Sequence, residues 1–407
     1  MTKSKKITRR QAVALGLGTF ASVGACQGLN RINQHQQQSV LLTSSKDRDF
    51  AVVGDNALKQ RAAAKKLLFG AATSYFKLRL DPSFANSFLK ECSVLMAEGD
   101  LLWCAIRPSI DSFAFERSDW LVEFAQSQNL VMGATHLVWH HCMPGWFKET
   151  VNQQNAQQIM LDHIKTVVGR YAGKIHYWSV INEAVNPGDH RDNGLGNTPW
   201  LDFLGPDYIE IGFRAAAEAD PQALLLINDT DLELDIPYQD RKRAAVLKLL
   251  ESLKSKGVPV HGLGIQAHID PVKGKVNPQK LKDFLSSVAD LGLKIAITEM
   301  DIVDANLPND IDTRDRIVAQ YYEDLLSAFL DEQATVAVTT WGLSDRFTWV
   351  ATAREDGAPA RPLPLDAFLN RKLAWNAIAR AFDESPKRDS SSSLWNSWEN
   401  LNQETRE

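Results

Sequence analysis

Two glutamates stand in short segments whose residue types suit the cleavage of a bond between sugars. Glu183 lies in Trp178–Ala184, and Glu299 lies in Ile297–Asp301. If these segments end two opposed strands, the two carboxylates can flank one glycosidic bond. A separation of about 5–5.5 Å would let one of them act as nucleophile, whereas a wider gap would admit a water that inverts the product. One carboxyl must hold a proton while the other stays ionised, so their surroundings must differ.

Short apolar runs recur along the chain between longer helical patterns. Several are apolar at consecutive positions, as parallel strands covered on both faces are. The runs are Lys66–Thr73, Leu101–Arg107, Leu130–Trp139, Ile175–Asn182, Leu224–Asp229, Gly262–His268, Lys294–Glu299 and Val336–Trp341. This alternation predicts an α/β fold, a single (β/α)8 TIM barrel, rather than an open sheet. In such a barrel the side chains that do chemistry lie where strands end and loops begin.

Composition and short motifs exclude several other classes of protein. The chain has 407 residues, of which 44% are hydrophobic and 23% charged, so it is neither disordered nor collagen-like. A formal charge of −5 disfavours a general nucleic-acid binder. The sequence contains no glycine-rich dinucleotide or phosphate loop in a suitable context and no HExxH zinc helix. Cys92, Cys104 and Cys142 lack CxxC spacing, which predicts buried free thiols rather than a zinc site.

The N-terminal residues have the pattern of an export signal. Residues 1–25 contain five basic residues and no acidic one, and Arg9-Arg10 precede the uncharged run Ala12–Ala25. This arrangement predicts a twin-arginine-like signal peptide. The run ends in Val23–Cys26, which resembles a lipoprotein cleavage box with Cys26 as the lipidated residue. The alternative is ordinary cleavage and a soluble exported protein.

These patterns divide the chain into four parts. We expect a signal peptide at 1–25, a polar linker at 26–54, one catalytic domain at 55–383 and a polar tail at 384–407. The predicted location is outside the cytoplasm: periplasmic, extracellular or lipid-anchored to a bacterial membrane. We expect a monomer.

Six motifs carry a resemblance to a known family. They are Phe69–Ala72, Leu137–His140 with Pro144 and Trp146, Trp178–Ala184, Gly262–His268, Thr298–Asp301, and Trp341–Asp345 with Trp349. In this order they resemble glycoside hydrolase family 10, the endo-β-1,4-xylanases, over residues 55–383. The signal is specific because the motifs fall at barrel spacing.

The resemblance implies a role for each matching residue. Glu183 would be the general acid/base and Glu299 the nucleophile, with net retention, while His268 bonds the nucleophile and is oriented by Asp301. A carboxylate held in this way stays ionised, because opposite charge and hydrogen bonds favour the charged form. Sugar contacts are implied for Asn182, Gln266, Trp139, His140, Glu98, Asn228, Trp341 and Trp349. The implied partner is a xylan-like β-glycan and not a nucleic acid; no metal or organic cofactor is needed, and membrane attachment would occur only through lipidated Cys26.

The second-strand motif of the family is altered in this chain. The family run Glu-Asn-Glu-Met-Lys-Trp reads Glu-Gly-Asp-Leu-Leu-Trp over residues 98–103. Gly99 and Leu102 therefore replace an asparagine and a lysine that hold sugars on the non-reducing side. Glu98 is retained.

The third- and fifth-strand motifs also depart from the family. Thr135 replaces the first histidine of the third-strand motif, and His136 follows it. Since adjacent strand residues face opposite sides, we expect His136 to point away from the site unless a bulge intervenes. Cys142 stands in place of a glutamine, after His141, and Thr230 in place of a tyrosine.

Three interpretations remain open at this point. The chain is a retaining endo-1,4-β-xylanase, a retaining glycosidase on a different or decorated β-glycan, or a non-catalytic carbohydrate-binding surface lipoprotein.

Overall fold

The computed structural model describes residues 48–354, 357–389 and 395–396. The predicted signal peptide, Cys26 and most of the linker lie outside the described residues, as does most of the tail. The predicted division of the chain into four parts therefore stays a prediction.

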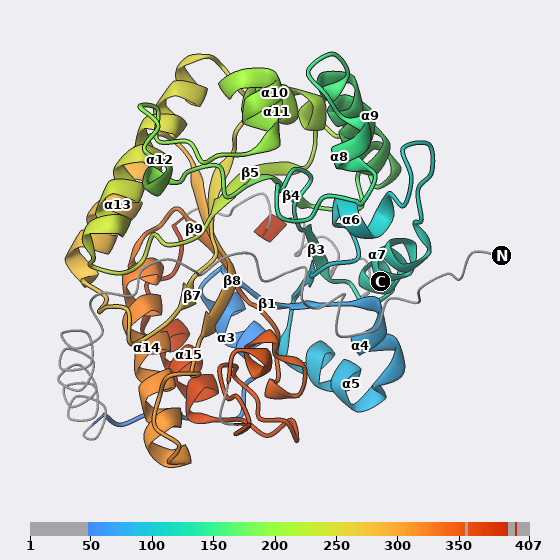
Figure 1. Cartoon of the computed structure of the whole chain (residues 1–407). Helices are drawn as coiled ribbons and strands as arrows, with labels where there is room; N and C mark the ends of the chain where they lie inside the picture. The colour runs from blue at the N-terminus through green and yellow to red at the C-terminus, as the bar shows by residue number, and fades with distance from the viewer. Residues whose placement is uncertain (1–47, 355–356, 390–394, 397–407) are drawn as a thin grey trace.

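Eight parallel strands in the described part of the chain close into a barrel (Figure 1). They are β1 (Leu68–Thr73), β2 (Val94–Ala97), β3 (Val131–Ala134), β4 (Tyr177–Asn182), β5 (Leu224–Asp229), β6 (Gly262–Ile265), β8 (Lys294–Ile302) and β9 (Thr335–Thr340). The strands pair in chain order, β6 with β8, and β9 returns to β1. The two-residue strand β7 (His268–Ile269) extends the β6 segment along β8. The predicted (β/α)8 barrel is confirmed.

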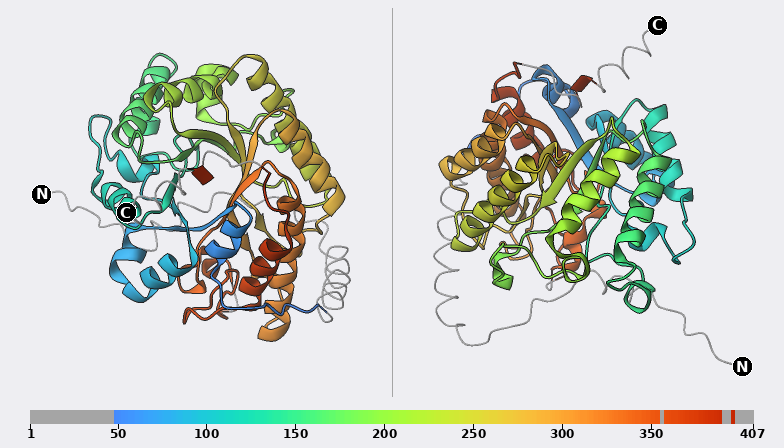
Figure 2. Two further views of the ribbon diagram at one scale, coloured as in Figure 1. Left: turned by 180° about the vertical axis from the view of Figure 1, so that it is seen from behind. Right: turned by 90° about the horizontal axis from the view of Figure 1, so that it is seen from above.

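Helices surround the strands on the outside, as the two further views in Figure 2 show. They are α3 (Leu58–Ala64), α4 (Tyr75–Leu80), α5 (Pro82–Glu91), α6 (Trp103–Ile106), α7 (Glu116–Ser127), α8 (Phe147–Thr150), α9 (Ala156–Arg170), α10 (Pro199–Leu204), α11 (Tyr208–Ala219), α12 (Pro237–Ser255), α13 (Pro278–Asp290), α14 (Ile311–Asp331) and α15 (Leu373–Glu384). The strands are buried along almost their whole length because side chains fill the barrel and helices cover it. Over the ranges that the structure describes, no helix is both long and apolar enough to cross a membrane.

Several helix starts can be traced to single residues. The Asp81 carboxylate accepts a hydrogen bond from the Phe84 amide at the start of α5, and Pro82 occupies the first turn. Asn277 does the same for Lys280 at the start of α13. These side-chain acceptors satisfy backbone amides that have no hydrogen-bond partner inside the helix. Proline is suited to the first turn because the N–H that it lacks would have no partner there.

One predicted strand is wrong. The run Leu101–Arg107 contains the helix α6, and the second barrel strand is the earlier run Val94–Ala97. Both runs are short and apolar, so periodicity alone cannot separate them. The sheet register identifies Val94–Ala97 as the second strand, because Val94 pairs with Gly70 on β1 and with Val131 on β3. Trp103 instead packs outward, stacked on His163 with 3.8 Å between ring centroids.

The chain beyond α15 returns to the start of the barrel. Arg388 is buried and its amide donates to the Lys65 carbonyl, next to β1. Its guanidinium donates to the carbonyls of Thr335 and Leu330, next to β9. Trp395 is buried among the apolar side chains inside the barrel.

Candidate active site

Five polar side chains meet at the carboxyl ends of β4, β5 and β8 and just after β6. This catalytic floor consists of Asn182, Glu183, Asn228, Gln266 and Glu299, and four of the five are at most 4% exposed. Neighbouring strands bring them together, since Asn182 pairs with Asn228 and Asn228 with Gly264 in the sheet. A β-carbon at Gly264 would overlap the Asn228 amide oxygen. Glycine at that position therefore makes room for the floor.

Glu183 is held by its backbone and by three donors. Its φ of +53° is unusual for a residue with a side chain, and its amide donates to the Asn228 carbonyl at 2.9 Å. Oε1 accepts from Gln266 Nε2 at 3.0 Å and from Asn182 Nδ2 at 3.1 Å. Oε2 accepts from Trp139 Nε1 at 3.0 Å.

Glu299 lies where β8 departs from regular pairing. The register between β8 and β9 shifts by one residue between Ile297 and Met300, and the Glu299 amide donates to the Gln266 carbonyl at 3.1 Å. Oε1 accepts from Asn228 Nδ2 at 2.7 Å. The side-chain oxygen of Asn228 in turn accepts from Thr298 Oγ1 at 2.7 Å, which orients the amide.

His268 bridges Glu299 and a second, fully buried carboxylate. Its Nε2 lies 3.3 Å from Glu299 Oε2, and its Nδ1 lies 2.9 Å from Asp301 Oδ1. Burial alone would lower the pKa of His268, but the negative charges and hydrogen bonds of Asp301 and Glu299 raise it well above 6.5. His268 is therefore a protonated imidazolium that donates to both carboxylates. Trp349 Nε1 donates to the other oxygen of Asp301 at 2.6 Å.

His136 reaches the site, so the expectation that it points away is wrong. Its Nε2 lies 3.6 Å from Glu299 Oε1, and Nδ1 lies 2.8 Å from Ser179 Oγ. In the pairing with β4, Ala134 lies opposite Trp178 and Val138 lies opposite Ile181. The segment after β3 therefore advances by four residues where β4 advances by three. This extra residue is a bulge, and it reverses the alternation of side chains. Burial lowers the pKa of His136 below its ordinary value.

The two glutamates have different surroundings. Burial raises the pKa of Glu183, but the hydrogen bonds from Gln266 and Trp139, together with the nearby His136 and His141, outweigh burial and lower it below its ordinary value. Glu299 instead faces the imidazolium of His268 and the neutral amide of Asn228. The side chains that donate to Glu183 are thus the neutral groups of Gln266, Asn182 and Trp139, whereas Glu299 also faces the imidazolium of His268.

A cavity of about 820 Å³ opens beside Glu183. Its lining includes His140, His141, Asn186, Tyr238 and Lys242. Lys242 forms a buried ion pair with Asp229 at 2.7 Å. Burial, with the neighbouring His141, lowers the pKa of His140 to about 4, so this imidazole is neutral. The sequence motifs gave no signal for Tyr238 or Lys242, which come from α12 rather than from a strand end.

Other predicted sugar-binding residues lie around the floor. The ring of Trp341 meets His268 edge-on at 6.0 Å between centroids, and that of Trp349 does so at 5.6 Å. Glu98 follows β2 directly, and its carboxylate forms an ion pair with Lys77 of α4. No feature of the second-strand motif indicated Lys77.

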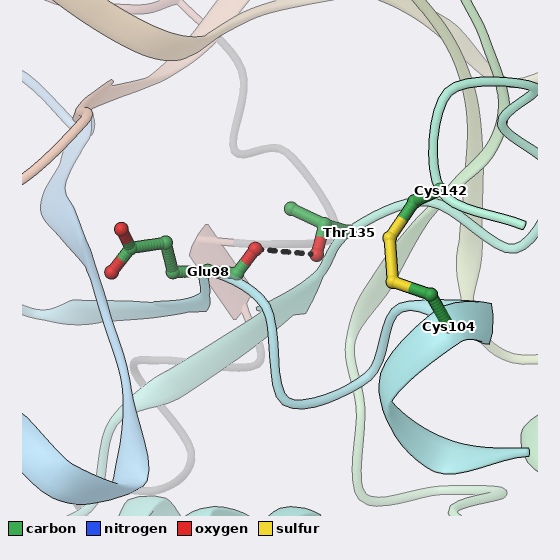
Figure 3. Close-up of a disulfide and its surroundings, with 4 residues drawn as sticks. All are labelled: Glu98, Cys104, Thr135 and Cys142. Atoms are coloured by element: carbon green, nitrogen blue, oxygen red, sulfur yellow. Dashed lines mark hydrogen bonds between the residues drawn. A yellow bond between two sulfur atoms is a disulfide. The ribbon is translucent and has the colours of Figure 1, made fainter. Parts of the chain in front are cut away.

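The altered rim of the barrel follows β2 and β3, and Figure 3 shows part of it. We use rim for residues 98–104 and 135–142. Thr135 Oγ1 donates to the carbonyls of Ala97 at 2.8 Å and Glu98 at 3.3 Å. Thr135 therefore ties the third strand to the second.

A disulfide joins Cys104 and Cys142 across this rim, so the prediction of free thiols is wrong for these two cysteines. They are 38 residues apart in sequence, but they follow neighbouring strands, which brings their Cα atoms to 5.3 Å. The sequence analysis could not predict this disulfide, because it placed the second strand at Leu101–Arg107 instead of Val94–Ala97. Cys92 is a buried free thiol, as expected.

Comparison with known proteins assigns the family. Residues 57–381 match the model of glycosyl hydrolase family 10. The chain belongs to glycosyl hydrolase family 10. A beta-1,4-xylanase of Dictyoglomus thermophilum is 34% identical over 319 residues, which cover 76% of this chain and 87% of that relative.

Two solved family 10 structures have the same fold as this chain. The native xylanase 10B of Thermotoga maritima is 31% identical, with a TM-score of 0.73, and the match covers 81% of this chain and 98% of that one. The xylanase 10B of Thermotoga petrophila RKU-1 in complex with xylobiose is 30% identical, also with a TM-score of 0.73, covering 82% of this chain and 99% of that one. The resemblance inferred from the six motifs is confirmed. This family 10 protein is a glycoside hydrolase.

Proposed function

We infer that the protein is an endo-1,4-β-xylanase that hydrolyses internal xylosidic bonds with retention. The arrangement of Asp301, His268 and Glu299 supports this inference most directly, because it orients the Glu299 carboxylate beside a histidine whose pKa is raised well above 6.5. The names of the relatives, and the xylobiose in one of the solved structures, favour xylan as the substrate.

The reaction proceeds in two displacements. Glu299 attacks the anomeric carbon while the bond to the leaving oxygen breaks and Glu183 gives that oxygen its proton. The ionised Glu183 then takes a proton from a water as that water attacks the same carbon and releases Glu299. Asn228 and His268 hold the nucleophile through both steps.

Glu183 must gain its proton when substrate is bound. In the substrate-free site its pKa is lowered, and both of its oxygens are occupied by donors. A sugar that covers the carboxyl excludes water, which raises the pKa of a carboxyl group. We therefore expect the basic limb of kcat to lie at higher pH than the basic limb of kcat/KM, since the first reports the substrate complex and the second the free enzyme.

The test is product release from a panel of plant, algal and bacterial polysaccharides. The proposal predicts short xylo-oligosaccharides from xylan by wild type and none by Glu299→Ala, with azide restoring turnover of an activated aryl xyloside by the variant. If wild type and Glu299→Ala are equally inactive on every polysaccharide, the protein is not an enzyme. A better rate on another β-glycan would change the substrate and keep the chemistry.

We propose in addition that the protein is exported, with Cys26 as the site of a lipid anchor. The basic N-terminus and the Val23–Cys26 segment support this proposal, and so does the disulfide, because such bonds persist mainly in oxidising compartments. Fractionation of a bacterial host tests it. The full chain should be found with membranes and Cys26→Ser in the soluble exported fraction, whereas a cytoplasmic location for both would contradict the proposal.

A further inference from the structure

The loop after β3 brings two side chains to the acid/base carboxylate. We call residues 137–146 the Trp139 loop. Trp139 Nε1 donates to Glu183 Oε2, and His141 Nε2 lies 3.8 Å from the same oxygen. The rings of Trp139 and His141 meet edge-on, with 5.7 Å between their centroids. The loop therefore supplies two of the side chains that lie closest to Glu183 Oε2.

Beyond Val138, Met143 and Trp146 of the Trp139 loop pack against the hydrophobic core, but only a few polar or covalent links hold the part of the loop near His141. The Cys142 amide donates to the Trp139 carbonyl at 3.3 Å, which closes a turn within the loop itself. The disulfide to Cys104 and the bond from Trp146 Nε1 to the Arg107 carbonyl, at 2.9 Å, then connect the loop to the segment after β2. Of these, the disulfide lies nearer to His141.

The other end of the disulfide is firmly anchored. Cys104 follows Trp103, which is buried, stacks on His163 and contacts the ring of Trp200 at 5.2 Å between centroids. Cys104 itself is exposed, whereas Cys92 is buried. A small reductant can therefore reach the disulfide from solvent.

We propose that the Cys104–Cys142 disulfide is a positioning element that holds Trp139 and His141 against Glu183. The inference rests on the proposed function, because it concerns the acid/base of that reaction. A dithiol such as dithiothreitol cleaves the S–S bond, gives the two sulfurs two electrons and two protons, and leaves as a cyclic disulfide. The freed loop then loses its fixed position at Glu183.

The consequence for Glu183 has a defined sign. The titratable groups that face its carboxylate are His136, His140, His141 and Asp229. Trp139 and His141 both lower the pKa of Glu183, and they belong to the loop that the disulfide holds. Release of the loop removes these two contributions, so the pKa of Glu183 rises. Gln266 and His136 are held elsewhere and stay in place.

The experiment compares wild type, the double variant Cys104→Ser/Cys142→Ser and the control Cys92→Ala, each with and without dithiothreitol. The readouts are the pH dependence of kcat/KM on xylotetraose and a ¹³C titration of the Glu183 carboxyl, assigned with Glu183→Gln.

In reduced wild type and in the double variant, the basic limb should move up by about one pH unit. We expect kcat/KM to fall between about 10- and 100-fold at its optimum, because the acid/base is less well positioned. The control should respond to reductant as wild type does, and the double variant should not respond.

Three further results decide whether the disulfide positions the loop. Trp139→Phe should raise the basic limb without reductant and reduce the additional effect of dithiothreitol. A lower Tm with unchanged pH dependence and an unchanged Glu183 titration would show a merely structural bond and overturn the proposal. If wild type hydrolyses no xylotetraose in either state, the proposed function fails; the ¹³C titration then decides the positioning role alone, supporting it if the titration shifts and overturning it if not.

Discussion

Different interactions hold the side chains of the catalytic floor and the loops of the rim in place. In the floor, Asn182, Asn228 and Gln266 join the two glutamates through side-chain hydrogen bonds, and each residue is placed by the register of a strand. In the rim, loops are held by an ion pair, a threonine hydroxyl and a disulfide. Four of the five floor residues are buried among other polar side chains and can hardly be exchanged. Rim residues can be replaced if another cross-link takes over, and this explains how the chain keeps family 10 chemistry with a changed rim.

The largest expected effect in this comparison comes from Glu183→Gln. Loss of the proton donor should lower kcat/KM on xylan between about 10²- and 10⁴-fold. An aryl xyloside with a good leaving group needs no proton in the first step, so its first step should be nearly unaffected and a burst of phenol should appear. Pre-steady-state kinetics would show this. Equal losses on both substrates would argue against Glu183 as the acid/base.

The second prediction concerns Asp301→Asn, which keeps the shape of the floor and removes one buried charge. Without Asp301 the pKa of His268 falls, and Glu299 loses a charged donor at neutral pH. A hydrogen bond to a charged group contributes about 1.5–3 kcal/mol, so kcat should drop about 10- to 100-fold.

The same substitution has a pH-dependent effect on stability. The pKa of His268 is raised in the folded protein, so its stabilising contribution is fully present below about pH 6.5 and is lost as the pH rises through the raised value. The Tm of Asp301→Asn should therefore differ most from wild type below pH 6.5 and approach it in alkali. Trp349→Phe is the control, since it removes a bond to Asp301 without changing the charge. A Tm difference that is constant with pH would contradict the protonated state of His268.

The floor could be predicted from sequence because its residues sit in motifs that end strands. Strand ends in a barrel meet at one mouth, so Glu183, Glu299 and His268 were expected together, and the structure brings them together. The rim could not be predicted in the same way. A bulge changes which side His136 faces, and no single-residue pattern indicates it. The disulfide joins segments that only the pairing of β2 with β3 makes neighbours.

The third prediction tests whether Lys77 replaces the lysine lost at Leu102. The ion pair with Glu98 places a cation of α4, the helix that follows β1, beside the end of β2. Lys77→Met should raise KM for xylotetraose about 3- to 10-fold with kcat unchanged, because the contact is made equally in ground and transition states. Lys90→Met removes the same charge from the exposed face of α5 and should have no effect. A lower KM in Lys77→Met would mean that Lys77 blocks Glu98 instead of assisting it.

The smallest effect is expected for Thr135→Val, which removes the hydroxyl that ties β3 to the end of β2. The two carbonyls that it serves would lose one buried donor, at a cost of about 0.5–1.5 kcal/mol. For a domain of this size the Tm should fall by roughly 1–2 °C, measured by calorimetry. Because Thr135 contacts backbone and not the floor, kcat should stay within about twofold of wild type. Thr135→Ser is the matched control, since it keeps the hydroxyl. A fall in kcat with unchanged Tm would mean that Thr135 belongs to the catalytic floor, and the division between floor and rim would have to be redrawn.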